Sequence, residues 1–446
     1  MNNVRLRKLW DALHSSYWFL PSLMVLMAIA LSFIMLTLDR SIGFGDWNLI
    51  YTGGPDGARE VLSAIAGSMV SVAATAFSIT IVALQLAAAN FGPRLLRNFM
   101  QDTGNQVVLG TFIATFIYCL LVLRTIYGED YNPFVPHLSV TFGIVLAIFS
   151  IGVLIYFIHH ASTIIQASHV IHSVSEDFNK AVDRLFPEKI GISPPPNQQH
   201  TELLPDDFES LACPVGAKHS GYLQFIDDEQ LLKVACKHNL LLRLELRPGK
   251  FVIEDSILVL AFPGKRVNQK LIDEINKAFI LGRERTEQQD VEFPVNQLVE
   301  IAVRALSPGI NDPFTAIRCV DRLCAGMCYL VQRKCPSPYR YDRDRQLRII
   351  AEPVTFAGVM DSAFNPIRQY ARTDAAVTIH LLEAIAHIAQ YTHNPEYLAV
   401  LRRHADMIER GGKEGLPEPQ DRQDLQEKYL SVIQAVEQNH WISTNY

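Results

Sequence analysis

The sequence predicts a mainly α-helical membrane protein, with four transmembrane helices followed by a cytoplasmic α+β module and a helical bundle. Three observations predict this class. The first 160 of the 446 residues contain four apolar stretches long enough to cross a hydrocarbon core of about 30 Å, which takes about 20 helical residues. Short strand-like runs follow a Pro-rich segment, and from residue 267 onward apolar residues recur at helical spacing.

The predicted transmembrane domain covers residues 1–160, and its helices cover residues 18–38, 62–88, 107–126 and 138–158. Basic residues precede the first helix, as in a signal peptide, but no small-residue cleavage site follows it. We therefore expect a membrane helix that is retained.

Charge around the predicted helices indicates their orientation. The loop 127–137 contains Glu129 and Asp130 and no Lys or Arg. Five basic residues would lie on the other side of the membrane: Arg5, Arg7, Lys8, Arg94 and Arg97. The positive-inside rule then predicts cytoplasmic N- and C-termini, although Arg40 and Arg59 reduce the contrast. The stretch 93–100 is predicted as a short amphipathic helix on the inner membrane surface.

The rest of the chain divides into three predicted parts. Residues 161–192 continue the fourth helix without Gly or Pro until residue 187, which predicts a cytoplasmic stalk. A Pro-rich linker opens the small α+β module of residues 193–265. Its runs 221–226 and 240–247 look like strands, and the second alternates over its last residues. Residues 266–446 have helical periodicity and are predicted to form the helical cytoplasmic domain.

Composition excludes some functions. The net charge of −6 and the lack of a basic block argue against nucleic acid as a partner. Six of the seven cysteines follow the last membrane helix, on the predicted cytoplasmic side, where thiols stay reduced. No nucleophile elbow, HExxH, P-loop or kinase motif is present, so we expect no enzyme activity.

A polar seam runs along the second membrane helix. Its positions advance by alternating three and four residues, which places them on one face of a helix. They are Ser68, Ser71, Thr75, Ser78, Val82 and Gln85, with Ala89 next in the series.

Two interpretations of this seam stay open. Small residues and hydroxyls suit close packing between membrane helices, and composition favours that interpretation. In an oligomer the same seam from each subunit would surround a pore, with hydroxyls replacing part of an ion's hydration and Gln85 near the inner mouth. The seam spans the full membrane depth and contains no ionisable residue, which favours the pore. Arg124, near the outer end of the third helix, is an interfacial anchor or part of an outer vestibule.

A second motif, Ser307-Pro-Gly-Ile-Asn-Asp-Pro, interrupts the helical pattern of the cytoplasmic part. Pro308 and Gly309 end one helix, while Asn311 or Asp312 can cap the next helix. The motif therefore predicts a rigid helix-loop-helix corner. The alternative is an anion site at the new helix start, with Arg304 and Arg318 nearby, but the spacing is not that of a P-loop.

Histidines and cysteines give no metal motif. His159, His160, His169 and His172 follow the fourth helix, and Cys319, Cys324, Cys328 and Cys335 lie on or beside a predicted amphipathic helix. The cysteine spacing is not that of a zinc site, so we expect buried thiols. His169 and His172 share a helix face and could hold a transition metal with help from another subunit, but we expect interfacial or solvated histidines, with no metal and no cofactor.

The run 304–316, which contains the motif Ser307-Pro-Gly-Ile-Asn-Asp-Pro, resembles the signature of a bacterial family of predicted integral membrane proteins. That family is classed as a domain of unknown function. The resemblance extends to Gln85-Leu86, to the run 91–99 and to residues 102–106. It implies a membrane architecture in the bacterial inner membrane, without an established activity and without catalytic or ligand residues.

The favoured hypothesis is a homo-oligomeric ion channel with a cytoplasmic regulatory or assembly domain. Its expected partners are membrane lipid, further copies of the chain and inorganic ions. The alternatives are a membrane-anchored sensor or scaffold, in which the seam is a dry packing interface, and a membrane enzyme with a pocket of ionisable groups.

Overall fold

The structure is a computed structural model that describes residues 18–41, 51–92, 102–127, 134–164, 166–186 and 204–445. The chain divides into two compact units, Met1–Val170 and Ile171–Tyr446. The orientation argument from the basic residues Arg5, Arg7, Lys8, Arg94 and Arg97 falls outside the described residues, as do the predicted amphipathic helix 93–100 and the Pro-rich linker.

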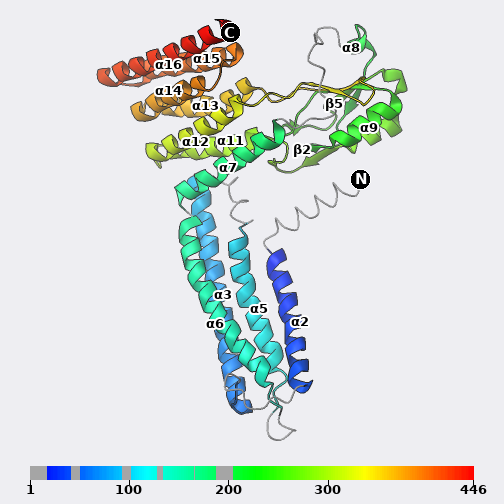
Figure 1. Ribbon diagram of the computed structural model, residues 1–446, viewed down its shortest axis with the longest axis vertical. Helices are drawn as coiled ribbons and strands as arrows, with labels where there is room; N and C mark the ends of the chain where they lie inside the picture. The colour runs from blue at the N-terminus through cyan, green and yellow to red at the C-terminus, as the bar shows by residue number, and fades with distance from the viewer. Residues whose placement is uncertain are drawn as a thin grey trace. The chain divides into compact units, whose positions relative to one another are not determined.

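The first unit consists of four long apolar helices (Figure 1). They are α2 (Phe19–Ser41), α3 (Pro55–Phe91), α5 (Thr103–Leu123) and α6 (His137–Ile164). By length and composition each can cross a membrane, which confirms the predicted fold class of this part. Helix α3 is longer than predicted: its 37 residues span about 55 Å, well beyond a hydrocarbon core of about 30 Å.

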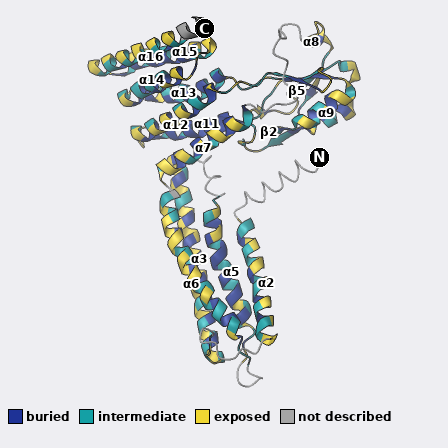
Figure 2. Cartoon of the chain, in the orientation of Figure 1, coloured by how far each residue is buried: buried dark blue, intermediate teal, exposed yellow. Residues whose placement is uncertain are grey.

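Helix α5 is the central helix of this unit, packing against α2, α3 and α6, and it is the most buried of the four (Figure 2). Gly110 allows the close approach of α2, because a Cβ atom there would lie 3.2 Å from the Cα atom of Pro21. Small residues at helix contacts serve this purpose in membranes, where packing replaces the hydrophobic driving force.

Hydrogen bonds join three of these helices at one end of the unit. Asp39, near the end of α2, accepts hydrogen bonds from the backbone N–H groups of Leu138 (2.8 Å) and Ser139 (3.0 Å) and from the Ser139 hydroxyl (2.6 Å). The buried Tyr118 of α5 donates its hydroxyl to the Ser139 carbonyl (3.0 Å). Asp39 thus satisfies the free N–H groups at the start of α6 from a neighbouring helix.

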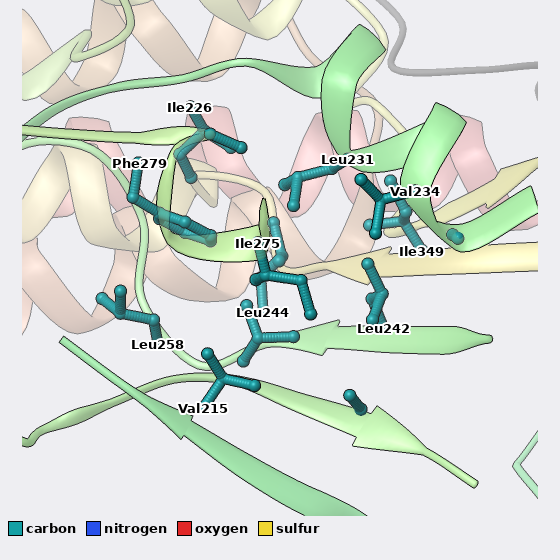
Figure 3. Packing of buried hydrophobic residues seen from close by; sticks show 14 of the residues in the cluster. Val215, Ile226, Leu231, Val234, Leu242, Leu244, Leu258, Ile275, Phe279 and Ile349 are labelled. Carbon is teal, nitrogen blue, oxygen red and sulfur yellow. The ribbon is translucent and has the colours of Figure 1, made fainter. Parts of the chain in front are cut away.

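The second unit contains an α+β module. Its helices are α8 (Phe208–Leu211), α9 (Asp228–His238) and α10 (Gln269–Asn276), and its strands are β1 (Cys213–Gly216), β2 (Gly221–Ile226), β3 (Leu241–Leu244), β4 (Phe251–Val252), β5 (Ile257–Phe262) and β6 (Phe279–Gly282). Apolar residues from α9, α10 and both sheets pack into one core (Figure 3). Local capping fixes α9, since Asp227 accepts from the Gln230 N–H at 3.0 Å and Asn239 ends the helix with a positive φ of 49°.

The module also includes two strands from much later in the sequence. Strands β7 (Tyr339–Tyr341) and β8 (Leu347–Ala351) complete a five-stranded sheet in the order β1-β5-β3-β8-β7. The β3–β8 pair is parallel, and the other pairs in this sheet are antiparallel. The remaining strands form a sheet in the order β4-β2-β6.

Helices form the rest of this unit: α11 (Glu292–Ala305), α12 (Pro313–Val331), α13 (Phe356–Ala371), α14 (Ala375–Gln390), α15 (Pro395–Gly415) and α16 (Pro419–Asn445). The range 266–446, predicted to form a helical domain, therefore also contains β6, β7 and β8. These strands are three to five residues long and too short for their period to stand out from the flanking helices.

Helix α7 (Ala167–Leu185) is separate from α6, because Gln166 is not helical, whereas a continuous stalk was predicted. From Ile171 onward its apolar face is buried within the second unit. Phe178 lies against Gly326 of α12, where a Cβ atom would come within 2.1 Å of the Phe178 ring. Asp183 accepts hydrogen bonds from Tyr329 and from Arg333 (2.7 Å), so this part of α7 is docked on α12.

Candidate functional site on helix α3

The polar seam predicted on the second membrane helix lies on the exposed face of α3. All six of its positions are exposed in the single chain: Ser68, Ser71, Thr75, Ser78, Val82 and Gln85. Helix α3 packs against α5 and α6 through other residues. The four-helix unit therefore leaves the seam without a helix partner among the described residues.

The packed face of α3 lies about 180° around the helix from the seam, at about 100° per residue. It is formed by buried small and apolar residues, namely Ala58, Leu62, Ala66, Met69, Ala73, Ala76, Thr80, Ala87 and Phe91. Alanine at five of these positions lets α3 approach its neighbours closely. Helix α3 thus has small residues on two faces, one that packs within the unit and one that is exposed.

The exposed hydroxyl groups all donate their protons to their own helix. Ser71 donates to the Gly67 carbonyl at 3.1 Å, Thr75 to Ser71 at 2.9 Å and Ser78 to Ala74 at 2.8 Å. Ser68 donates to Ile65 at 2.9 Å. A hydroxyl whose proton is used in this way still offers oxygen lone pairs to a ligand. The seam therefore presents acceptor oxygens along α3.

Large apolar side chains border the seam on both sides. Val70, Phe77 and Ile81 are exposed on one side, and Ile79 and Leu86 on the other. These side chains suit lipid or apolar contact with a neighbouring subunit. The acceptor oxygens consequently form a narrow strip between two apolar borders.

The seam continues beyond its predicted start toward the N-terminus of α3. Gly67, Ala64 and Glu60 are exposed and follow the same spacing of three and four residues. Sequence reasoning missed Glu60, because the helix was predicted to begin at residue 62, whereas Pro55 at its first turn starts it earlier. The strip therefore has a carboxylate at one end and Gln85 toward the other.

Arg124, predicted as an anchor or vestibule residue, is exposed at the C-terminal end of α5. It is not on the seam helix. At this end of the unit, Arg59 of α3 donates to the Ile126 carbonyl at 3.0 Å, which links α3 to the segment after α5. Its guanidinium group also lies 3.5 Å from the carboxylate of Asp56.

The motif 307–313 forms the corner between α11 and α12. Asp312 caps α12 by accepting from the Thr315 N–H (3.1 Å) and hydroxyl (2.6 Å), and these bonds lower the pKa of its carboxyl group. Asn311 has a positive φ of 50°, while Ser307 accepts two backbone hydrogen bonds across the turn and Pro308 and Gly309 are exposed. Asp312 already supplies negative charge at this helix start, so the geometry supports a structural corner.

The histidines of the predicted stalk make separate contacts. His160 Nε2 is 2.6 Å from the carboxylate of Asp102, which also caps α5 through the Gly104 N–H. His172 lies 3.4 Å from Glu176, and His159 and His169 are exposed. Within the described ranges no three His, Cys, Asp or Glu side chains come together as a metal site.

The cysteines of α12 are free thiols in the described structure. Cys319 is buried, and burial raises the pKa of its thiol. Cys324 donates to the Ala384 carbonyl, and Cys335 beyond the helix lies 3.2 Å from the Tyr397 hydroxyl. These contacts are those of packing residues.

Comparison with known proteins gives one family. The family described as "Predicted membrane protein (DUF2254)" matches residues 14–387. Uncharacterized proteins of Mycobacterium bovis and Mycobacterium tuberculosis are each 31% identical to this chain over 428 residues, which is 94% of this chain and 80% of each relative. No solved structure matches the chain. The matched range includes the whole exposed face of α3.

Proposed function

The chain belongs to the DUF2254 family of predicted membrane proteins, and on this premise we propose that it is a homo-oligomeric ion channel whose path is lined by the exposed seam of α3. One observation carries the proposal. The seam is exposed in the single chain, on the side of α3 opposite the face that packs within the four-helix unit. A helix that faced only lipid would have no use for a continuous row of hydroxyl groups.

The chemistry of the seam favours cations. Ser71, Thr75 and Ser78 offer oxygen lone pairs, because their protons are donated to backbone carbonyls. Such oxygens can replace part of the hydration of a cation. Glu60 at one end would add a ring of carboxylates in an oligomer, which raises the local concentration of cations.

The test is ion flux from liposomes that contain the purified full-length protein. We expect K⁺ efflux above that of protein-free liposomes. In current recordings of the reconstituted protein, the reversal potential should indicate a cation preference that is lost in Glu60→Gln. Ser78→Phe should reduce the efflux by narrowing the path, whereas the matched variant Ile79→Phe, on the apolar border, should not. The absence of flux above background, or equal flux in the two Phe variants, would contradict the proposal.

A membrane-anchored scaffold is the second candidate, and Ala64, Gly67 and Ala74 favour it because small residues let two copies of α3 pack closely. The channel and the scaffold differ in whether water contacts the seam. A scaffold would show stable self-association without ion flux, and the Phe substitution at Ser78 would then weaken association instead of conduction.

We place the protein in the bacterial inner membrane with both termini in the cytoplasm, and we assign it no enzymatic activity. The second unit would then regulate or assemble the membrane part. Membrane lipid, further copies of this chain and inorganic ions are the partners that this function requires, without a cofactor.

A further inference from the structure

The second unit contains a cavity of about 300 Å³ between the C-terminal turns of α13 and α15. Arg368 and Arg372 line it from the end of α13, and Arg410 and Glu414 line it from α15. Gly411 leaves it open, because a Cβ atom at this position would meet nothing within 4 Å. The cavity is open to solvent, and three guanidinium groups and one carboxylate line it.

The three arginines lack the acidic partner that several other arginines of the same unit have. Arg285 is paired with Asp290 at 2.6 Å, Arg348 with Asp342 at 2.7 Å and Arg403 with Asp361 at 2.6 Å. Among the described residues, no ion pair and no side-chain hydrogen bond is found for Arg368, Arg372 or Arg410. Only Glu414 brings negative charge to the lining, so the four charges sum to +2.

Arg368 is held in this place at an energetic cost. Its Nε atom is buried without a hydrogen-bond partner. Desolvation, and then the nearby charge of Arg410, lowers the pKa of its guanidinium group. A buried donor without a partner destabilises a fold, and more so when it is charged. The carbonyl ends of α13 and α15 offset part of this cost, since helix C-termini favour cations.

We propose that this cavity binds a phosphate monoester. A phosphate monoester carries a charge of about −1.5 to −2 at pH 7, which matches the lining charge, and its oxygens accept paired hydrogen bonds from guanidinium groups. Met407 and the open space at Gly411 leave room for the group that the phosphate carries. This chemistry is shared by soluble phosphorylated metabolites and by the headgroup of phosphatidic acid.

The experiment measures the melting temperature of the full-length protein in nanodiscs of phosphatidylcholine. Glycerol 3-phosphate is the soluble probe, with sodium chloride at equal ionic strength as its control. Nanodiscs with added phosphatidic acid provide the lipid probe. A saturable rise in melting temperature with the first probe assigns the site to soluble metabolites, and a rise only with the second assigns it to the lipid headgroup.

Arg410→Gln should weaken the apparent affinity about tenfold or more, as expected for the loss of hydrogen bonds to a charged group. Without ligand, the same variant should melt at the same or a higher temperature than the wild type, because it removes repulsion with Arg368. Arg402→Gln, an exposed arginine of α15 that does not line the cavity, is the matched control and should respond like the wild type.

No saturable shift with either probe would overturn the proposal, as would an equal shift in Arg410→Gln and the wild type. Both readouts are independent of ion flux. The phosphate-binding proposal can therefore be contradicted while the channel proposal is supported, and the reverse.

Discussion

Ser78 and Thr80 lie two residues apart on α3, use their hydroxyl groups in the same way and face opposite sides of the helix. Ser78 is exposed and donates to the Ala74 carbonyl at 2.8 Å, whereas Thr80 is 6% exposed and donates to the Ala76 carbonyl at 2.9 Å. The hydroxyl of Thr80 is used within the unit. That of Ser78 belongs to a row that no helix of the described unit covers.

Self-association through the seam should be detectable by cross-linking. In membranes, Ser71→Cys should give dimers with a short bifunctional maleimide, since copies of α3 would face each other across the assembly axis. Ala73→Cys is the matched control, because Ala73 is buried on the opposite face of the same helix. Equal yields of dimer for the two variants, read by gel electrophoresis, would contradict this arrangement.

Asp39 should stabilise the membrane unit through the start of α6. Asp39→Ala removes three hydrogen bonds to a carboxylate, each of which contributes about 1.5–3 kcal/mol, and it leaves the N–H groups of Leu138 and Ser139 unpaired. The melting temperature should fall by several degrees. Asp39→Asn keeps one acceptor oxygen and should give a smaller loss. An unchanged melting temperature for the Ala variant would show that these bonds add little.

Docking of α7 on α12 should depend on Gly326. The variant Gly326→Ala would place a methyl group 2.1 Å from the buried Phe178 ring, so the ring and α7 must shift. Such overpacking typically costs about 1–3 kcal/mol. Hydrogen exchange over residues 171–185 should become faster. The same substitution at Gly309, where a Cβ atom meets nothing within 4 Å, should leave exchange unchanged.

Acid should destabilise the second unit through His404. Burial is the main cause that lowers its pKa to about 4; Asp361 opposes the shift, and Arg403 and Arg368 add to it. The folded-state pKa is below the ordinary value of 6.5, so the unfolded chain takes up a proton first as pH falls. Stability should therefore decrease from about pH 6.5 to pH 4, by on the order of 3 kcal/mol from this group.

The control for this effect is His404→Gln, which can keep the hydrogen bond to Asp361 but does not titrate between pH 4 and pH 7. The difference in melting temperature between the wild type and this variant should be largest near pH 7.5 and should shrink toward pH 4.5. A constant difference over this range would show that His404 does not carry the acid sensitivity.

The apolar stretches and the 3–4 spacing predicted the four membrane helices and the seam, because both are properties of local sequence. The early start of α3 at Pro55 was missed, since the turn cluster that precedes residue 60 concealed its first turn. Strands β7 and β8 were missed because each gains its partners only from tertiary contacts, β8 pairing with β3 about a hundred residues earlier.

Tertiary structure was also needed to place the seam on the outside of the unit. The sequence spacing shows that Ser71 and Thr75 share a face, but it does not show whether α5 or α6 covers that face. The cavity of Arg368, Arg372 and Arg410 could not be predicted for the same reason, because its residues come from two helices that are separate in sequence.

The central claim is that the exposed seam of α3 lines an aqueous path. Its most direct test is the effect of a water-soluble thiol reagent on K⁺ current through single-cysteine substitutions in reconstituted full-length protein. Of the native cysteines, Cys119 is the one in the described membrane helices, and it is buried, so the wild type provides the background. We predict that current falls in Ser71→Cys, Thr75→Cys and Ser78→Cys and stays unchanged in Ala73→Cys and Thr80→Cys. Unchanged current at all three seam positions would contradict the account.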